Sequence, residues 1–386
     1  MDSKLMINKV LNIDKSSWVL TKLGDLAKDI SKRVDNPGES EYDKFVGLIN
    51  FVSGDIKIKT WETTENLASS AKAFQAGDIL FARRNAYLRR ASLVDFDGCC
   101  SGDAFVLREN HNKVVSGFLA FLMNSNALWD YANSNAAGTM SKRVKWRDLA
   151  EYEFLLPPKD QQAQLAKLLW AIDDVIEKEE KMLEIFNNYW FSILKENFQN
   201  NTSRVPLIKL CSAPPKYGAN SPSIDFDGEI RYLRITDIGD FGELNNDKVS
   251  ANEHNDKYLL TYGDFLLART ADPGRSYYYK VKDGRCTHAG YLIKFRLDLE
   301  KILPEYLYFY SQTKEFKIWI NQTTRTGTIS NINAQEFSNM KVPFVDISIQ
   351  KKSIENIISN YNKLKILKSK IKSSQSLQKS LINQIF

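Results

Sequence analysis

The sequence is poor in the residues from which most catalytic sites are built. It has three histidines and four cysteines among 386 residues, and His111, His254 and His288 are too scattered to predict a metal cage or a catalytic triad. It also lacks the glycine-rich patterns of a P-loop, a dinucleotide site or a nucleophile elbow. His288 adjoins a strand-like run, where a structural role is a simpler interpretation than a catalytic base. We therefore expect a non-catalytic chain with no cofactor of its own.

Cysteine pairs and long apolar runs are equally scarce. Cys99 and Cys100 are adjacent and cannot readily bridge each other, and no C-x-x-C occurs, which favours a reduced chain. No apolar run approaches the roughly 18 residues that span a bilayer. The N-terminal stretch has no continuous apolar segment of the kind found in signal peptides. These features predict a cytoplasmic protein without membrane contact.

Positive charge and aromatic residues are abundant. Lys plus Arg number 53 and Asp plus Glu 47, so the formal net charge is +6 and the pI is about 8.8. The 17 Tyr, 21 Phe and 7 Trp residues suit well-packed cores and also base stacking. A mildly basic chain permits a polyanionic partner, and the position of its charged patches decides whether it has one.

The second half of the chain repeats the first half. Four landmarks recur in the same order, 186 to 189 residues apart: Gly77-Asp78 and Gly263-Asp264, Gly138-Thr139 and Gly327-Thr328, Leu156-Pro157 and Val342-Pro343, Phe198 and Phe386. Such agreement predicts that a unit covering half of the chain is duplicated.

Each predicted unit consists of a mixed α/β region followed by a long helix. Short β-rich runs at 45–52 and 230–235 are followed by helices at 117–131 and 304–323. We expect an α+β protein with a pseudo-two-fold repeat, in which two similar mixed α/β domains are joined by two long helices forming an antiparallel coiled coil. The expected boundaries are a first domain at 1–158, a first long helix and linker at 159–203, a second domain at 204–347 and a second long helix at 348–386.

The long helices have heptad patterns. Spacings of three and four residues run through the following positions: Leu165, Leu168, Ile172, Val175, Glu179, Met182, Phe186, Tyr189 and Ile193 in the first helix, and Ile354, Ile357, Tyr361, Leu364, Lys368, Ile371, Gln375, Gln378, Ile382 and Ile385 in the second. Each helix would be about 60 Å long. Glu179 and Lys368 occupy equivalent positions near the helix centres. An antiparallel pair would bring them together and fix its register, whereas the alternative is two charges on solvated faces.

Basic and polar residues gather in the loops of the two mixed regions. The candidates for DNA contact in the first unit are Arg83, Arg84, Asn85, Tyr87, Arg89, Arg90, Lys142, Arg143, Lys145 and Arg147. Those in the second unit are Lys216, Tyr217, Arg269, Thr270, Arg275, Tyr277, Tyr278, Arg325, Thr328 and Asn331. Arg offers paired donors to guanine and phosphate, Asn binds adenine, and Lys provides a point charge for phosphate. The alternative is that these are ordinary charged loops and that Tyr277–Tyr279 is a strand.

This organisation resembles the specificity subunit of type I restriction–modification systems along essentially the whole chain. Gly77–Arg83 and Gly263–Arg269 look like the family's strand-and-loop signature within each target-recognition domain. Gly138-Thr-Met-Ser and Gly327-Thr-Ile-Ser look like the segment leading out of that domain. Leu156–Gln162 looks like the helix-start signature. Its counterpart, Val342-Pro343 with Gln350, departs from the signature because Phe344 replaces the second proline and the spacing is longer.

The resemblance implies a mechanism. Each half of the chain would read one half of a split target in double-stranded DNA, and the helices would set the spacing and dock DNA adenine methyltransferase subunits. Those partners would bring S-adenosylmethionine, and a restriction and translocase subunit would use ATP and Mg²⁺. The helix residues Trp170, Ile185, Trp190 and Leu194 are candidates for packing on partner helices or on the neighbouring recognition domain.

Three rival functions remain at this point. One is an enzyme with its own methyltransferase or nuclease site. Another is a coiled-coil scaffold whose mixed domains bind protein rather than DNA. An orphan specificity subunit that serves methylation only would have the same fold. The sequence does not specify the bases that are read.

Overall fold

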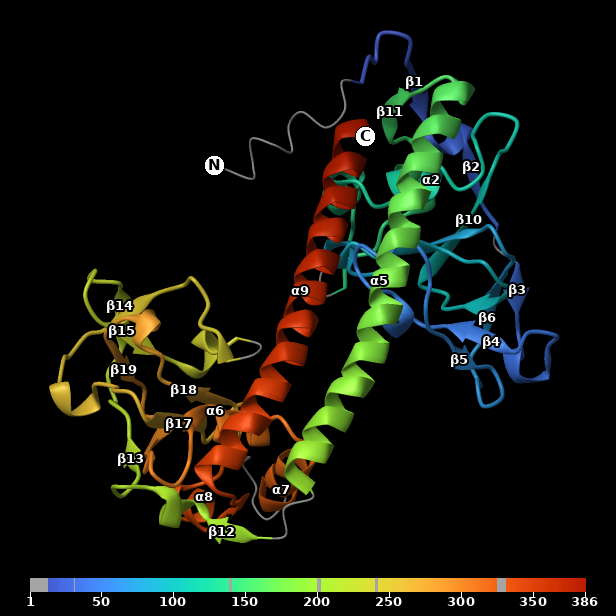
Figure 1. Ribbon diagram of the computed structural model, residues 1–386. Helices are drawn as coiled ribbons and strands as arrows, with labels where there is room; N and C mark the ends of the chain where they lie inside the picture. The colour runs from blue at the N-terminus through green and yellow to red at the C-terminus, as the bar shows by residue number, and fades with distance from the viewer. Residues whose placement is uncertain (1–12, 31, 139–140, 200–202, 240–241, 325–330) are drawn as a thin grey trace. The chain divides into compact units, whose positions relative to one another are not determined.

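The computed structural model describes residues 13–30, 32–138, 141–199, 203–239, 242–324 and 331–386. It contains two compact units. Unit 1 comprises residues 1–181 and 368–386, and unit 2 comprises residues 182–367. Each long helix therefore contributes one part to each unit (Figure 1).

Unit 1 is built around two small sheets. The four-stranded sheet has the order β2 (Ala27–Asp29), β10 (Ala104–Glu109), β7 (Ile79–Ala82) and β8 (Ala91–Leu93). The five-stranded sheet has the order β3 (Arg33–Val34), β6 (Ala71–Phe74), β9 (Gly98–Cys100), β4 (Lys44–Val46) and β5 (Glu62–Thr63). A separate ribbon pairs β1 (Val19–Lys22) with β11 (Glu153–Leu156). The β7 strand is buried at every position because neighbouring strands and helices cover both of its faces.

Unit 2 repeats this topology. Its four-stranded sheet has the order β13 (Lys216–Tyr217), β20 (Leu292–Arg296), β17 (Asp264–Ala268) and β18 (Ser276–Tyr278). The parallel pair β15 (Arg231–Leu233) and β19 (Cys286–His288) corresponds to the parallel pair of β4 and β9 in unit 1. Two further ribbons pair β14 (Ser223–Asp225) with β16 (Val249–Ala251) and β12 (Arg204–Pro206) with β21 (Lys341–Pro343). The expected α+β fold with two similar mixed domains is confirmed.

Short helices complete the cores of both units. They are α2 (Leu119–Leu122), α3 (Asn126–Ser134) and α4 (Trp146–Ala150) in unit 1, and α6 (Pro304–Ser311), α7 (Lys314–Thr324) and α8 (Ala334–Asn339) in unit 2. Each single helix expected from the sequence is therefore divided in two. At the divisions, the Ser125 hydroxyl accepts a hydrogen bond from Leu128 N and the Thr313 hydroxyl accepts one from Phe316 N, so each second helix starts with its own side-chain cap.

The long helices are α5 (Lys159–Gln199) and α9 (Ile347–Ile385). In unit 1, Gln378 Nε2 donates to Asp173 Oδ1 at 3.0 Å, and Lys370 Nζ lies 3.2 Å from Glu179 Oε1. In unit 2, the rings of Trp190 and Tyr361 lie 5.8 Å apart. Within unit 1, later residues of α5 meet earlier residues of α9, so the two segments run antiparallel there.

Both long helices begin with the same buried side chain. Gln162 Nε2 donates to Pro157 O at 2.8 Å, and its Oε1 accepts from Val115 N at 2.9 Å. Gln350 Nε2 donates to Val345 O at 2.9 Å, and its Oε1 accepts from Leu303 N at 2.9 Å. The glutamine of the helix-start signature therefore ties the first turn to the recognition domain, which explains its presence in both repeats.

The predicted heptad pattern describes α9 better than α5. On α9 the pattern residues are buried or half-buried, apart from Gln375. On α5, however, Leu168, Val175, Met182 and Tyr189 are exposed, and the residues buried in the first half of the helix are Gln162, Ala166, Leu169, Asp173, Ile176 and Glu179. The expected seam was therefore wrong by one position from Leu165 to Val175, where the following residue is buried in each case, whereas Glu179 is buried as expected.

Glu179 is paired with a cation of α9, as an antiparallel arrangement requires. That cation is Lys370, and Glu179 is 5% exposed. The predicted contact between Glu179 and Lys368 stays a prediction. Among the described residues, none of the helices is long and apolar enough to cross a membrane.

Candidate nucleic-acid interface

The aspartate of the repeated Gly-Asp segment is a buried structural anchor. Gly77 and Gly263 adopt positive φ angles of 92° and 95°, which turn the chain into β7 and β17. Asp78 Oδ1 and Oδ2 accept from Arg108 Nε and Nη2, both at 2.8 Å, and Asp264 is clamped by Arg296 in the same two-pronged way. Both aspartates are at most 1% exposed. In each unit, the pair of aspartate and arginine fixes the strand that leads to the loop arginines.

The end of each anchored strand meets the turn that enters the adjacent strand. In unit 1, Arg83 N donates to Asp103 O at 3.0 Å, and in unit 2, Arg269 N donates to Tyr291 O at 3.0 Å. Arg83 and Arg269 directly follow β7 and β17, so these two backbone corners are equivalent. We call them the Asp103 corner (Arg83, Arg84, Asp103, Ser141 and Arg143) and the Tyr291 corner (Tyr217, Arg269, Tyr291 and Asn331).

Three guanidinium groups converge on one carboxylate in the Asp103 corner. Arg143 Nε donates to Asp103 Oδ1 at 2.9 Å, Arg84 Nη1 lies 3.5 Å from Oδ2, and Arg83 Nε lies 3.8 Å from Oδ1. Arg84 Nε also donates to the Ser141 hydroxyl at 2.7 Å. The Arg143 hydrogen bond, together with the three positive charges, lowers the pKa of Asp103. Three cations against one anion leave a net charge of +2, which suits an anionic ligand.

The Tyr291 corner holds a single guanidinium between an aromatic ring and an amide. Arg269 Nε donates to Asn331 Oδ1 at 3.0 Å, and its guanidinium lies 5.1 Å from the centre of the Tyr217 ring. Tyr291 is 63% exposed. A cavity of about 420 Å³ adjoins this corner, with walls that include Thr270, Ala271, Tyr232, Arg234 and Tyr291. A stacked arginine beside an open aromatic surface suits contact with bases.

Several predicted DNA contacts are committed to interactions within the protein. Arg89 donates to Asn126 and Asp130 at 2.8 and 2.7 Å, and Arg90 donates to Leu48 O at 2.8 Å. Arg275 donates to Asp272 Oδ2 and to Ile238 O, both at 2.6 Å. The structure therefore does not gather these three arginines with the two corners. They connect their loops to α3 and to the segments around Leu48 and Ile238.

The aromatic run in unit 2 is a strand, as the alternative interpretation states. Tyr277 lies in β18, is fully buried, and donates its hydroxyl to Asp283 Oδ2 at 2.8 Å, while burial raises its pKa. Tyr278 is half-buried against Tyr308, with the ring centres 5.6 Å apart. Including Tyr277 among the DNA contacts was wrong, because pairing of β18 with β17 places its ring in the core.

The remaining predicted residues have diverse positions. Tyr87, Lys142, Lys145, Arg147, Lys216 and Asn331 are exposed, Thr270 is half-buried, and Asn85 is half-buried with a left-handed backbone. Arg325 and Thr328 lie outside the described residues. Sequence reasoning missed Asp103 and Ser141, since neither belongs to a basic cluster. The one available signal was the alignment of the turns before β10 and β20.

The helix residues expected to pack on partner helices pack mainly on the recognition domains. Trp170 meets Phe121 in unit 1 at a ring distance of 4.7 Å, and Trp190 and Leu194 belong to the core of unit 2. Ile185 is the exception and is 68% exposed. Packing on the neighbouring recognition domain, the second of the two alternatives, therefore holds for three of the four residues.

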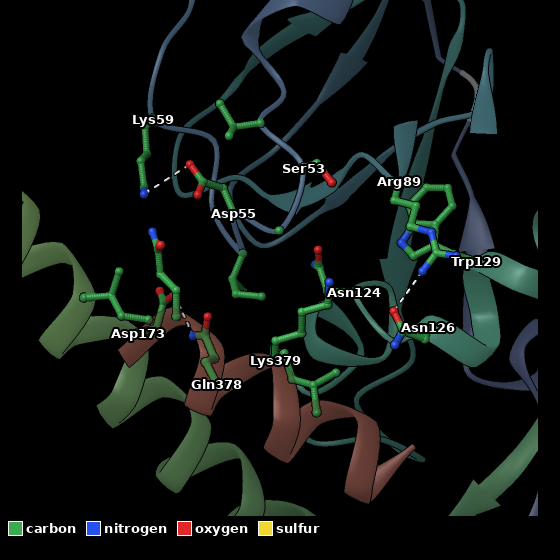
Figure 2. Close-up of a pocket in the computed structure, with 16 residues that line it drawn as sticks. Ser53, Asp55, Lys59, Arg89, Asn124, Asn126, Trp129, Asp173, Gln378 and Lys379 are labelled. Atoms are coloured by element: carbon green, nitrogen blue, oxygen red, sulfur yellow. Dashed lines mark hydrogen bonds and ion pairs between the residues drawn. The ribbon is translucent and has the colours of Figure 1, made fainter. Parts of the chain in front are cut away.

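A polar cavity of about 390 Å³ lies in unit 1 beside both helix segments (Figure 2). Lys59 bridges Asp55 and Glu180 of α5 at 3.1 and 2.7 Å. Lys57 contacts Glu177 and Asp173 at 2.8 and 3.5 Å. These ion pairs attach the first recognition domain to α5. In the described part of the chain, no cluster of His, Cys, Asp or Glu could hold a metal ion.

Known proteins share both the sequence pattern and the fold. Two curated relatives are each 25% identical to this chain: the specificity subunit of the type I restriction enzyme EcoDI of Escherichia coli, over 198 residues, and that of HindI of Haemophilus influenzae, over 174 residues. These matches cover 50% and 42% of this chain. They span 44% and 36% of the relatives, which is less than half of their length.

Solved structures resemble the chain over nearly its full length. The S subunit of a type I restriction–modification system from M. genitalium has a TM-score of 0.62 at 15% identity, covering 97% of this chain and 98% of the other. A chain from a study of complex assembly and conformational transition in the type I R-M system has a TM-score of 0.58 at 20% identity, with 96% of both chains covered. At these identities the likeness shows the fold.

The family comparison covers both repeats. The model of the type I restriction modification DNA specificity domain matches residues 15–185 and again residues 213–375. One match falls on each copy of the Gly-Asp strand and its arginine corner. Since the two matches together include well over half of the sequence, the chain belongs to the family of type I restriction–modification DNA specificity domains.

Proposed function

We propose that this chain binds double-stranded DNA and reads a split target, with one half-site contacted by each unit. The observation that carries the proposal is the pair of equivalent corners. Both follow the same anchored strand and the same backbone hydrogen bond, yet they present different side chains. A common frame with different reading groups is what recognition of two unlike half-sites requires.

The partners in this proposal supply the chemistry. DNA adenine methyltransferase subunits would bind S-adenosylmethionine and methylate the target, and a restriction and translocase subunit would use ATP with Mg²⁺. This chain would bring them to the DNA in the cytoplasm without a catalytic step of its own. The family membership supports this division of roles, and the net charge of +2 in the Asp103 corner supports DNA as the ligand.

The test joins methylation mapping to binding measurements. Adenine methylation is mapped genome-wide with and without this chain, and the split motif that disappears is used as a labelled duplex. Affinity for that duplex should fall steeply with salt, with a slope of about 0.9 per phosphate neutralised. Arg84→Ala and Arg269→Ala should each weaken binding by about 1–3 kcal/mol if they contact bases.

Arg33→Ala is the matched control. Arg33 forms an exposed ion pair with Asp35 at 2.6 Å and belongs to neither corner, and its removal should leave affinity unchanged. Binding to unrelated duplexes with equal affinity, or no salt-dependent binding at all, would refute the proposal and favour a protein-assembly scaffold. A motif that is methylated but never cleaved would identify a subunit that serves methylation only.

A further inference from the structure

The two equivalent corners differ at one decisive position. The residue whose carbonyl accepts from the arginine after the strand is Asp103 in unit 1 and Tyr291 in unit 2. In unit 1 a carboxylate therefore stands among the arginines, while in unit 2 a phenol ring takes its place. Arg269 is held instead by Asn331 and Tyr217.

Asp103 is already occupied by its own arginines. Its side chain is 19% exposed, and its two oxygens face Arg143, Arg84 and Arg83. An aspartate in this position is poorly placed to accept from a cytosine amino group, because its oxygens already have partners. Its effect is exerted through the arginines that it holds.

Arg84 and Arg143 keep donors available after these contacts. Arg143 uses Nε and Nη2 on Asp103, at 2.9 and 3.4 Å, and Arg84 uses Nε on Ser141 and Nη1 on Asp103. A guanidinium has five N–H donors, so each group retains others for a ligand. Both side chains are 43% exposed. Contacts with Asp103 and Ser141 fix the orientation of the two guanidinium groups, and their remaining N–H donors are available to a ligand.

We infer that Asp103 is a positioning residue that presents Arg84 and Arg143 to a guanine in the half-site read by unit 1. This inference rests on the proposed function and names the base that the corner recognises. A guanine presents two acceptors, O6 and N7, to a fixed arginine fork. A phosphate contact needs charge more than orientation, whereas Asp103 lowers the charge of the cluster from +3 to +2 and fixes the orientation of the arginines. The presence of Asp103 therefore favours the neutral acceptors of a base.

The test probes each guanine of the mapped motif in turn. Labelled duplexes carry 7-deazaguanine, which lacks the N7 acceptor, at one position at a time. Wild-type complex should lose about fivefold or more in affinity at one guanine of one half-site. Asp103→Asn keeps the shape but removes the charge. It should lose most of the preference for that guanine, so that 7-deazaguanine lowers its affinity by less than about twofold, while the salt slope stays nearly constant because the arginines remain.

Two further variants make the result decisive. Arg84→Lys keeps the charge but removes the fork, and it should lose the same guanine preference, even if Asp103→Asn folds poorly. Asp35→Asn breaks an exposed arginine pair in the same unit and should change nothing. A uniform loss of affinity for all duplexes with a smaller salt slope would show a phosphate contact and overturn the inference, as would an unchanged guanine preference. Failure of the wild type to prefer the motif would refute the proposed function itself.

Discussion

The buried aspartates of the repeated segment allow a stability test in which the Asp–Arg pair of each unit is a control for that of the other. Asp264 is clamped by Arg296, lies 3.7 Å from Lys294 Nζ and accepts from Thr261 N at 2.9 Å. Asp78 has the equivalent clamp from Arg108. The perturbation is Asp264→Asn in unit 2 and Asp78→Asn in unit 1, which keeps the side-chain shape and removes the charge.

The two substitutions should lower the free energy of unfolding by different amounts because of Lys294. That side chain is 8% exposed, and burial lowers its pKa, against the opposing effect of Asp264. Without Asp264 the lysine loses its counter-charge inside the protein, and breaking a buried ion pair in this way costs about 3–5 kcal/mol. Arg108 is 37% exposed and can turn toward water, so Asp78→Asn should cost about 1–3 kcal/mol.

Amide hydrogen exchange resolves the two units separately. Amides of β17 should exchange about 100-fold faster or more in Asp264→Asn, while those of β7 stay unchanged. Asp298→Asn, which breaks the surface pair with Lys301, is the control and should leave the stability nearly unchanged. Adding Lys294→Met to Asp264→Asn should recover part of the loss. Equal costs for the two main variants, or a cost below about 1 kcal/mol for Asp264→Asn, would refute the reasoning.

Three other perturbations test the remaining structural claims. His288 is buried, its Nδ1 contacts Tyr258 O, and burial lowers its pKa from 6.5 to about 4. The unfolded chain takes up this proton first as pH falls, so wild type should lose about 3 kcal/mol more stability than His288→Asn between pH 7 and 4, measured by denaturant unfolding. Gln162→Leu should cost about 2–4 kcal/mol in thermal unfolding, since the buried Pro157 O and the half-buried Val115 N lose their partner, and unaltered stability would contradict this. Lys57→Ala should destabilise unit 1 by about 2 kcal/mol, and high salt should reduce the difference from wild type.

The duplication could be predicted because the same landmarks recur in the same order in both halves of the chain. Gly77-Asp78 and Gly263-Asp264 mark the same turn in both units because each strand needs a positive φ and a buried carboxylate at its start. The heptad pattern of α9 was also readable, since apolar side chains dominate its buried stripe. These features depend on local spacing, which a sequence displays directly.

The sequence contains much less information about the arrangement of the candidate site. Arg83, Arg84 and Arg143 were singled out for their charge, but Asp103, which gathers them, is an isolated acid between two strands. Arg89, Arg90 and Arg275 look the same in the sequence as the corner arginines. Only the fold shows that they bond to other segments of the protein, at Asp130, Leu48 and Ile238.

The sequence by itself determined the repeat, the α+β class, the two long helices and the strands that lead to the arginine loops. The tertiary structure alone decided which arginines stand together, why α5 buries Asp173 and Glu179 along its packed stripe, and why Tyr277 lies in the core. The physical reason is that hydrophobic and turn patterns act between neighbours in the chain. Ion pairs and burial depend instead on groups that folding brings together from distant positions, such as Asp103 and Arg143.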